Sequence, residues 1–292
     1  MNLDRLAPLA VAVIVAVAAS GGHRRLRPAT SATLLAVVMA ITVVAAVPSA
    51  LVAAIGFAAH PPALGGGFAW CHDVFGVHPY LDPWLGAAAA IWSTIAIWRV
   101  ARVVRSTRRL RRAGLGGMEV LDDDAPYAFT MPGPAGRVVV TTGLIAALDP
   151  PQFAVVVAHE RAHARHRHDR YLLLGDIATA IVPPLAPVRR RLRFELERWA
   201  DESAVRDTDG DRRNVAETLA QVALLADDRG AFRLGFSGLG VMARVEALLR
   251  PRPLNHQAAW GMTFGSATAI VAVAATVQLH HSLGLLHVVC PG

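Results

Sequence analysis

Four long apolar stretches constrain this chain more than any other feature of its sequence. They cover residues 6–20, 32–59, 84–104 and 258–279. Apart from the first, which is somewhat short, each reaches the length of about 20 mostly apolar residues that a membrane-spanning helix needs. The composition agrees, since 54% of the residues are hydrophobic and only 17% are charged. A cleaved signal peptide is the alternative for the first stretch, but the residues before it are hardly basic. We therefore expect a multi-pass membrane protein.

The placement of arginine predicts how these spans are oriented, because loops rich in basic residues stay in the cytoplasm. All 29 Lys and Arg positions are arginine, and a group of arginines directly follows the first stretch and another follows the third, whereas residues 60–83 hold none. We expect a protein of the plasma membrane whose N- and C-termini are external. The net charge of +7 then faces anionic lipid of the bilayer, and nucleic acid is not an expected partner.

This orientation divides the chain into three parts. Residues 1–104 would form three transmembrane helices with short loops, residues 105–256 a cytoplasmic domain, and residues 257–292 a final span with a short external tail. Cys71 and Cys290 would both be external and could pair in that oxidising environment; the alternative is two free thiols.

Residues 159–170 read HERAHARHRHDR and carry the strongest chemical signal. His159 and His163 are four positions apart, so on a helix both imidazoles project from one face and can reach one Zn²⁺ ion. Glu160 can take a proton from zinc-bound water, whose pKa the metal lowers to about 7. A catalytic zinc also needs a third protein ligand and an open position. The candidates for that ligand are His166, His168, Glu195, Glu197, Asp201 and Glu202.

One straight helix cannot surround a tetrahedral ion with three ligands, which favours a ligand from a second helix. Apolar residues at helical spacing predict such a helix over residues 189–208. On it, Glu197 could bind zinc while Asp201 hydrogen-bonds a ligating imidazole. The alternative is a solvated acidic face among arginines. His166 and His168 are expected in a basic helix end at the membrane surface.

Local signals predict what precedes the histidine motif. Residues 127–131 and 137–142 are expected to be two strands around a turn rich in proline and glycine. Asp149, Pro150 and Gln152 have the pattern of a helix start, with a capping aspartate, a proline at the first helical position and a glutamine that completes a capping box.

Taken together, HERAH at 159–163, ERWAD at 197–201 and the strand run before them resemble the gluzincin membrane metallopeptidases. Two related types fit, the BlaR/MecR-type peptidases and the HtpX/CAAX-prenyl-protease type. We favour the BlaR/MecR type, because three spans precede the motif and one clear span follows it. The expected fold is mainly α, a multi-pass membrane protein with a small α+β gluzincin-like zinc peptidase domain.

The resemblance also implies roles for individual residues. His159, His163 and Glu197 would bind one zinc ion per chain, with Glu160 as the general base. The strand expected to receive the substrate, as an added β-strand, consists of Ala128, Phe129, Thr130 and Met131. The substrate would be a protein or peptide, such as a transcriptional regulator or a membrane-associated protein. No SxxK-type acylation site lies in the external parts, which argues against a β-lactam-sensing role and makes a separate sensor protein a candidate partner.

The same ligand set bears on a fifth apolar stretch, residues 171–187. His163 and Glu197 can meet at one ion only on the same side of the membrane, so this stretch cannot be a single span. It should be re-entrant, interfacial or packed within the domain. Attack on the substrate carbonyl also creates an oxyanion, which needs a hydrogen-bond donor. The candidate donors are Arg198, Asn214, His166 and His168, and the sequence favours none of them.

Three other functions are alternatives to the endopeptidase. An HtpX-like protease of membrane protein quality control is the nearest alternative. A histidine-rich metal transporter would need ionisable residues within its spans, and the four stretches hold almost none before their ends. A non-catalytic membrane adaptor would be expected to lack part of the zinc set, and nothing in that set is missing.

Overall fold

The computed structural model describes most of the chain, namely residues 6–58, 83–113, 117–133, 136–227, 238–250 and 257–287. Its long helices are α1 (Ala7–Ala19), which continues into the 3-10 helix η2 (Ser20–Arg25), α2 (Pro28–Ala58), α5 (Pro83–Ala113) and α12 (Gln257–His287). Within this described part of the chain, four helical segments are long and apolar enough to cross a membrane, and they coincide with the four predicted stretches. Cys71 and Cys290, for which a disulfide and two free thiols were the alternatives, lie outside the described residues.

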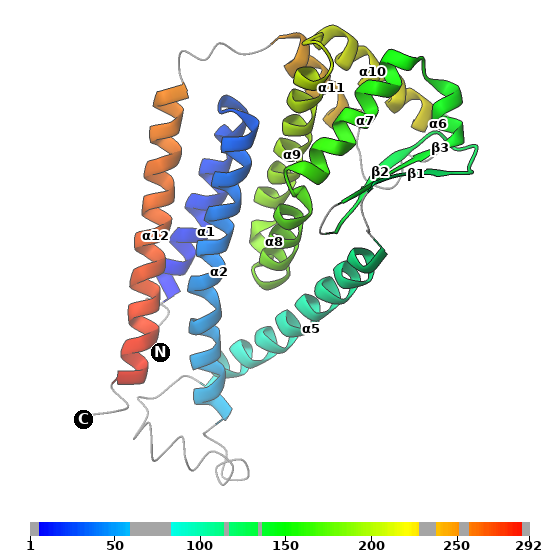
Figure 1. The fold of residues 1–292 in the computed structure, drawn as a ribbon. Coiled ribbons are helices and arrows are strands. Elements are labelled where there is room, and N and C mark those ends of the chain that lie inside the picture. The colour runs from blue at the N-terminus through cyan, green and yellow to red at the C-terminus, as the bar shows by residue number, and fades with distance from the viewer. Residues whose placement is uncertain are drawn as a thin grey trace.

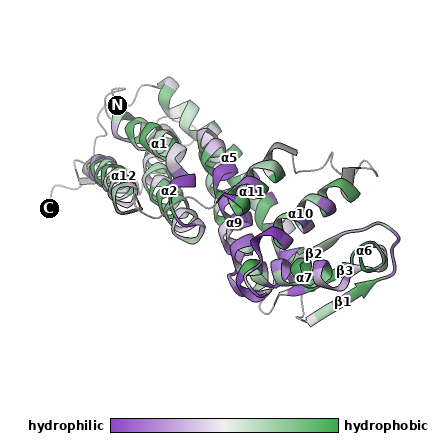
Figure 2. Ribbon diagram, turned by 90° about the horizontal axis from the view of Figure 1, so that it is seen from above, coloured by the Kyte–Doolittle hydropathy of each residue, from purple (hydrophilic) through white to green (hydrophobic). Residues whose placement is uncertain are grey.

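Helices α1, α2 and α12 stand side by side, and α5 runs obliquely from the end of α2 toward the sheet (Figure 1). Small side chains let these helices approach closely, and Ala12, Ala16 and Ala32 are almost completely buried between them. A polar link joins α2 to α12, where Nε2 of Gln278 donates to Oγ of Ser49 over 2.9 Å. Apolar residues dominate this bundle, whereas polar residues gather around α7 and α9 (Figure 2).

A three-stranded sheet lies beside the helix that carries the histidines. Its strands are β1 (Gly117–Leu121), β2 (Ala128–Met131) and β3 (Arg137–Thr141), in the order β1-β3-β2. β3 pairs with β1 in parallel and with β2 in antiparallel. The two predicted strands are confirmed, while β1 was missed because all five of its residues are exposed and lack the alternation of a half-buried strand. β2 is thus an edge strand.

The sheet is fixed to α7 (Pro150–Arg165) by close packing. Val138 and Val140 of β3 form a small core with Val157 of α7. Gly136 approaches α7 so closely that an added Cβ would lie 2.6 Å from Cβ of Ala164, and its φ of +59° also favours glycine. Gly136, directly before β3, therefore lies against the histidine helix.

Helix α7 begins as the sequence predicts. The side chain of Asp149 accepts a hydrogen bond from the amide of Gln152 over 2.8 Å, and the side chain of Gln152 accepts one from the amide of Asp149 over 3.2 Å. This capping box, with Pro150 in the first turn, fixes the start of α7 after the short helix α6 (Thr142–Ala147).

The fifth apolar stretch folds back on itself. It forms most of α8 (His168–Ile181), the 3-10 turn η4 (Pro183–Leu185) and the start of α9 (Ala186–Asp207). The hairpin of α8 and α9 packs against α2 and α5 (Figure 1). This stretch is not among the candidate spans, in agreement with the prediction that it turns back rather than crosses.

Two shorter helices complete the domain, α10 (Arg212–Asp227) and α11 (Gly238–Leu249). They pack against each other, and both contact α9. Val155 of α7, Val215 of α10 and Leu248 of α11 belong to one buried cluster. α11 is thereby placed next to the part of α9 that bears the acidic residues.

Candidate metal centre

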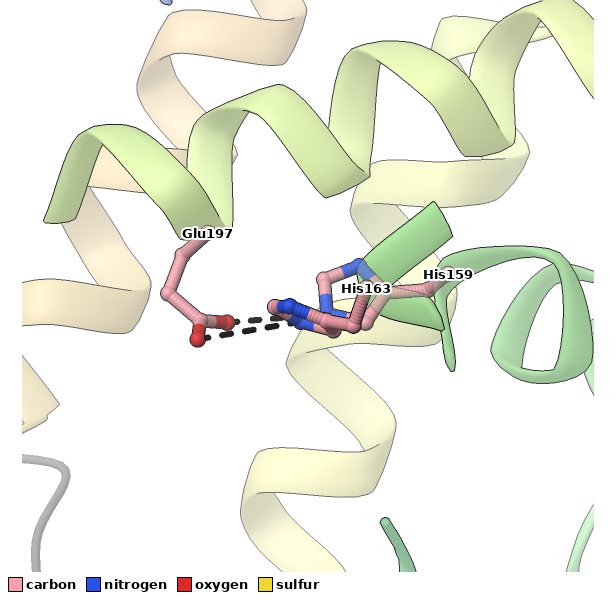
Figure 3. Close-up of side chains that lie close together, drawn as sticks. All are labelled: His159, His163 and Glu197. Atoms are coloured by element: carbon pink, nitrogen blue, oxygen red, sulfur yellow. Dashed lines mark hydrogen bonds and ion pairs between the residues drawn. The ribbon is translucent and has the colours of Figure 1, made fainter. Parts of the chain in front are cut away.

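The packing of α7 against α9 brings two histidines and a glutamate together. Nε2 of His159 lies 3.1 Å from Nε2 of His163. The carboxylate of Glu197 lies 3.5 Å from Nε2 of His159 and 3.8 Å from Nε2 of His163. Figure 3 shows both imidazoles directed toward this carboxylate. Of the acidic candidates from the sequence, Glu197 is the one that joins the two histidines in a possible metal-binding group.

This donor set fits a zinc ion. In a tetrahedral site with bonds of about 2.0–2.2 Å, neighbouring donor atoms are roughly 3.4 Å apart. The three separations here range from 3.1 to 3.8 Å. Two imidazole nitrogens and one carboxylate oxygen are also a set used by catalytic zinc, and three protein donors leave a fourth position for water or substrate.

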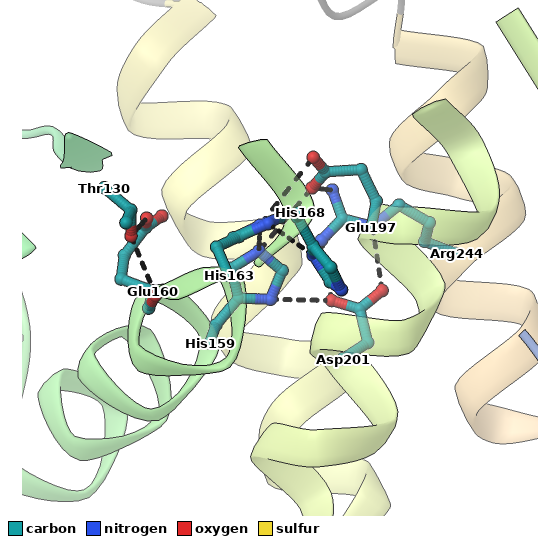
Figure 4. Close-up of polar contacts among 8 residues, drawn as sticks. All are labelled: Thr130, His159, Glu160, His163, His168, Glu197, Asp201 and Arg244. Carbon is teal, nitrogen blue, oxygen red and sulfur yellow. Dashed lines mark hydrogen bonds and ion pairs between the residues drawn. The ribbon is translucent and has the colours of Figure 1, made fainter. Parts of the chain in front are cut away.

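Asp201 and Arg244 lie on the side of the histidines that faces away from Glu160 (Figure 4). Oδ1 of Asp201 lies 3.1 Å from Nδ1 of His159. The guanidinium of Arg244 donates to both oxygens of Asp201 over 2.6 and 2.8 Å and lies 3.1 Å from Glu197. Since Asp201 and Arg244 are only 4% and 5% exposed, the pair is a buried, bidentate ion pair.

The electrostatics of this group favour charged carboxylates. Burial would raise the pKa of Glu197, but Arg244 and then His163 outweigh it and hold that pKa below its usual range. Burial is likewise outweighed at Asp201, where Arg244 and then His159 lower the pKa to about 2. Burial would lower the pKa of His159, yet the hydrogen bonds with Asp201 and Glu197 raise it to about 10. A metal ion bound at Nε2 of His159 would take the place of the proton on that nitrogen.

Sequence reasoning missed Arg244, although a signal was present. Val241, Arg244 and Leu248 lie at helical spacing on α11, and all three are buried. An arginine within the apolar stripe of a helix needs a buried anionic partner. That partner is Asp201, 43 positions earlier in the chain.

Glu160 and Thr130 form a second contact between α7 and β2. The hydroxyl of Thr130 lies 2.7 Å from the backbone oxygen of Glu160 and 2.7 Å from its carboxylate oxygen Oε2. Figure 4 shows the carboxylate of Glu160 turned toward Thr130. The candidate general base therefore lies between the pair of histidines and the edge strand.

The prediction for His168 was wrong. This side chain is 1% exposed rather than part of a basic surface, because α7 ends at Arg165 and His168 starts a new helix. Its Nδ1 lies 2.8 Å from Nδ1 of His163. Burial and then the neighbouring His163 lower the pKa of His168 to about 3.

The remaining candidates are placed elsewhere. Glu195 is fully buried on another face of α9, where it contacts His23 and Arg198, so Arg198 is tied to a structural ion pair. Glu202 is bound to Arg212. His166 lies 3.2 Å from Oγ of Ser203.

The region that carries this cluster is similar to known peptidases. The model of peptidase family M48 matches residues 99–224, which include the cluster of His159, His163 and Glu197. A protease HtpX homolog from Acidiphilium cryptum (strain JF-5) is 45% identical over 75 residues, which are 23% of this chain and 25% of that protein. The chain thus matches about a quarter of the length of this curated relative.

These similarities support a protease and a membrane metallopeptidase, as the sequence predicted. Of the two related types that the sequence resembles, they support the HtpX type.

Proposed function

We propose that this protein is an integral-membrane, zinc-dependent endopeptidase that hydrolyses peptide bonds of a protein substrate. One observation carries the proposal. His159 and His163 of α7 and Glu197 of α9 place three metal-binding atoms within 4.8 Å of one another, and Glu160 is adjacent on α7. The family match over residues 99–224 supports the same reaction class.

A zinc ion bound by His159, His163 and Glu197 would supply Lewis-acid polarisation of a water molecule and of the substrate carbonyl. In the proposed reaction, Glu160 takes the proton of the attacking water and passes it to the amine that leaves. The hydroxyl of Thr130 orients the Glu160 carboxylate from the other side. Asp201 accepts from Nδ1 of His159 and so keeps Nε2 of that residue directed to the site.

The substrate is proposed to bind in an extended form along β2. Two features support this. β2 pairs with β3 and lies at the edge of the sheet, and an edge strand offers backbone groups to an added strand. In addition, Thr130 of β2 contacts Glu160, so a peptide along β2 would lie next to the base. We propose substrates that reach the membrane surface, either membrane-associated proteins or a cytoplasmic regulator.

The proposed setting is the plasma membrane, with residues 105–256 in the cytoplasm and both termini outside. Support comes from the four apolar helices and from the arginines that follow the first and third of them.

The test compares the full-length wild type with Glu160→Gln in detergent, by zinc content and cleavage of casein. We expect zinc in both proteins, and a kcat at least about 100-fold lower in the variant, because general-base catalysis contributes about that much or more. A zinc chelator should abolish wild-type cleavage, and added zinc should restore it. Full activity of Glu160→Gln would overturn the mechanism, and a wild type that binds zinc without cleaving any protein would favour an adaptor or a transporter.

A further inference from the structure

His168 is a buried histidine that the proposed mechanism does not use. Its Nδ1 lies 2.8 Å from Nδ1 of His163, and the two rings meet edge-on, with centroids 4.8 Å apart and planes at 81°. Its other nitrogen, Nε2, is buried without a partner among the described residues. An unpaired buried nitrogen costs stability, so packing alone does not explain a histidine at this position.

The direction of this hydrogen bond follows from what the other nitrogen of His163 does. Only one proton can lie between the two Nδ1 atoms. Nε2 of His163 faces Nε2 of His159 at 3.1 Å and the carboxylate of Glu197 at 3.8 Å. A nitrogen that binds a metal there must be free of its proton, so His163 carries its proton on Nδ1. His163 is then the donor, and His168 is the acceptor.

We propose that His168 is a positioning residue of the metal site, whose Nδ1 accepts from Nδ1–H of His163 and thereby fixes the tautomer and ring orientation that present Nε2 to the metal. This inference rests on the proposed zinc site. It assigns the two histidine ligands different partners, because His159 is held by the carboxylate of Asp201 at 3.1 Å. The imidazole of His168 adds no negative charge to the site, whereas the carboxylate of Asp201 does.

The backbone and packing around His168 hold it in this place. Arg167, between α7 and α8, adopts a left-handed conformation with φ of +54°, which redirects the chain at the end of α7. The His168 ring then lies against Trp199 of α9, with centroids 5.0 Å apart. Trp199 is two positions after Glu197. The side chain of His168 therefore contacts both helices that carry metal ligands, α7 through His163 and α9 through Trp199.

Two substitutions separate hydrogen bonding from packing. In His168→Asn the side-chain oxygen lies near the place of Nδ1 and can accept, whereas His168→Leu fills similar space with no acceptor. His166→Leu is the matched control, because His166 also stacks on Trp199 but contacts Ser203 rather than a ligand. The zinc dissociation constant of each full-length protein is measured by competition with a chelating dye.

We expect about 10- to 100-fold weaker zinc binding in His168→Leu, and changes within about threefold in His168→Asn and His166→Leu. Wild-type affinity in His168→Leu, or equal losses in the Leu and Asn variants, would overturn the role of His168 while leaving the zinc site in place. A wild type that binds no zinc would instead overturn the proposed function, and this inference with it.

A second measurement tests the direction of the hydrogen bond between His163 and His168, even if His168→Leu does not fold. In ¹⁵N-histidine NMR of the zinc-loaded wild type, Nδ1 should be protonated in His163 and unprotonated in His168. The opposite pair of tautomers would overturn the proposal.

Discussion

The hydroxyl of Thr130 lies 2.7 Å from Oε2 of Glu160 and donates to it. This contact joins the edge strand β2 to the helix that carries the histidines. Thr130 is thus both part of the strand proposed to bind substrate and a neighbour of the proposed general base. Substrate binding and proton transfer would share this one side chain.

Replacing Thr130 by valine should therefore affect the chemical step more than binding. Valine keeps the shape of threonine and the backbone of β2, but it leaves Glu160 without its hydroxyl donor. We expect kcat to fall about tenfold, which corresponds to roughly 1.4 kcal/mol, with KM little changed. Thr130→Ser, which keeps the hydroxyl, should retain most of the activity. Equal kcat values for the valine variant and the wild type would argue against this role of Thr130.

Asp201→Asn should weaken metal binding without removing a ligand. Asparagine can still meet His159, but it lacks the charge that makes the imidazole a better ligand. Loss of such a supporting group commonly costs about 10- to 100-fold in metal affinity. Asp207→Asn is a suitable control, because Asp207 is on the same helix and its partner is Arg165. If both variants bound zinc equally well, the contact between Asp201 and His159 would have no part in the site.

Arg244→Met should lower stability, because it leaves the buried carboxylate of Asp201 and the partly buried carboxylate of Glu197 without their cation. Arg244 is 5% exposed and contacts both Asp201 and Glu197. Removing one partner from a buried ion pair typically costs about 3–5 kcal/mol. Arg212→Met breaks a more exposed pair with Glu202, which should cost at most about 1 kcal/mol. Thermal unfolding in detergent measures both, and similar melting temperatures for the two variants would contradict the prediction.

The orientation in the membrane can be tested with the chain's own cysteines. Only Cys71 and Cys290 occur, and both are predicted to be external. After reduction with an impermeant reagent, an impermeant maleimide should label them in intact cells, and Cys71→Ser together with Cys290→Ser should abolish the signal. Labelling that requires permeabilised cells would reverse the predicted topology.

The sequence was sufficient for those features that depend on local periodicity. The four apolar helices follow from length and hydropathy, and the start of α7 follows from its capping residues. His159 and His163 share a face because four positions are just over one helical turn. Because three ligands cannot come from one straight helix, the sequence pointed to a second helix, and the resemblance to the gluzincins implied Glu197 as the ligand on it. The packing of α7 on α9 brings Glu197 to the histidines.

Features that depend on distant contacts were missed. Arg244 reaches Asp201 across 43 positions, and no local pattern predicts which acid an arginine will meet. His168 was misplaced because the left-handed residue Arg167 ends α7 in a stretch whose composition suggests one continuous basic helix. β1 was missed because its pairing with β3 is not encoded in its own exposed residues.

The central claim is that His159, His163 and Glu197 together bind zinc, and the zinc content of Glu197→Ala tests it most directly. Glu202→Ala is the matched control on the same helix, since Glu202 pairs with Arg212 at 2.7 Å; Glu195 is less suitable because it is fully buried. After dialysis against buffered zinc, the wild type and Glu202→Ala should each retain about one zinc ion per chain, and Glu197→Ala should lose most of it. Full zinc content in Glu197→Ala would contradict the account.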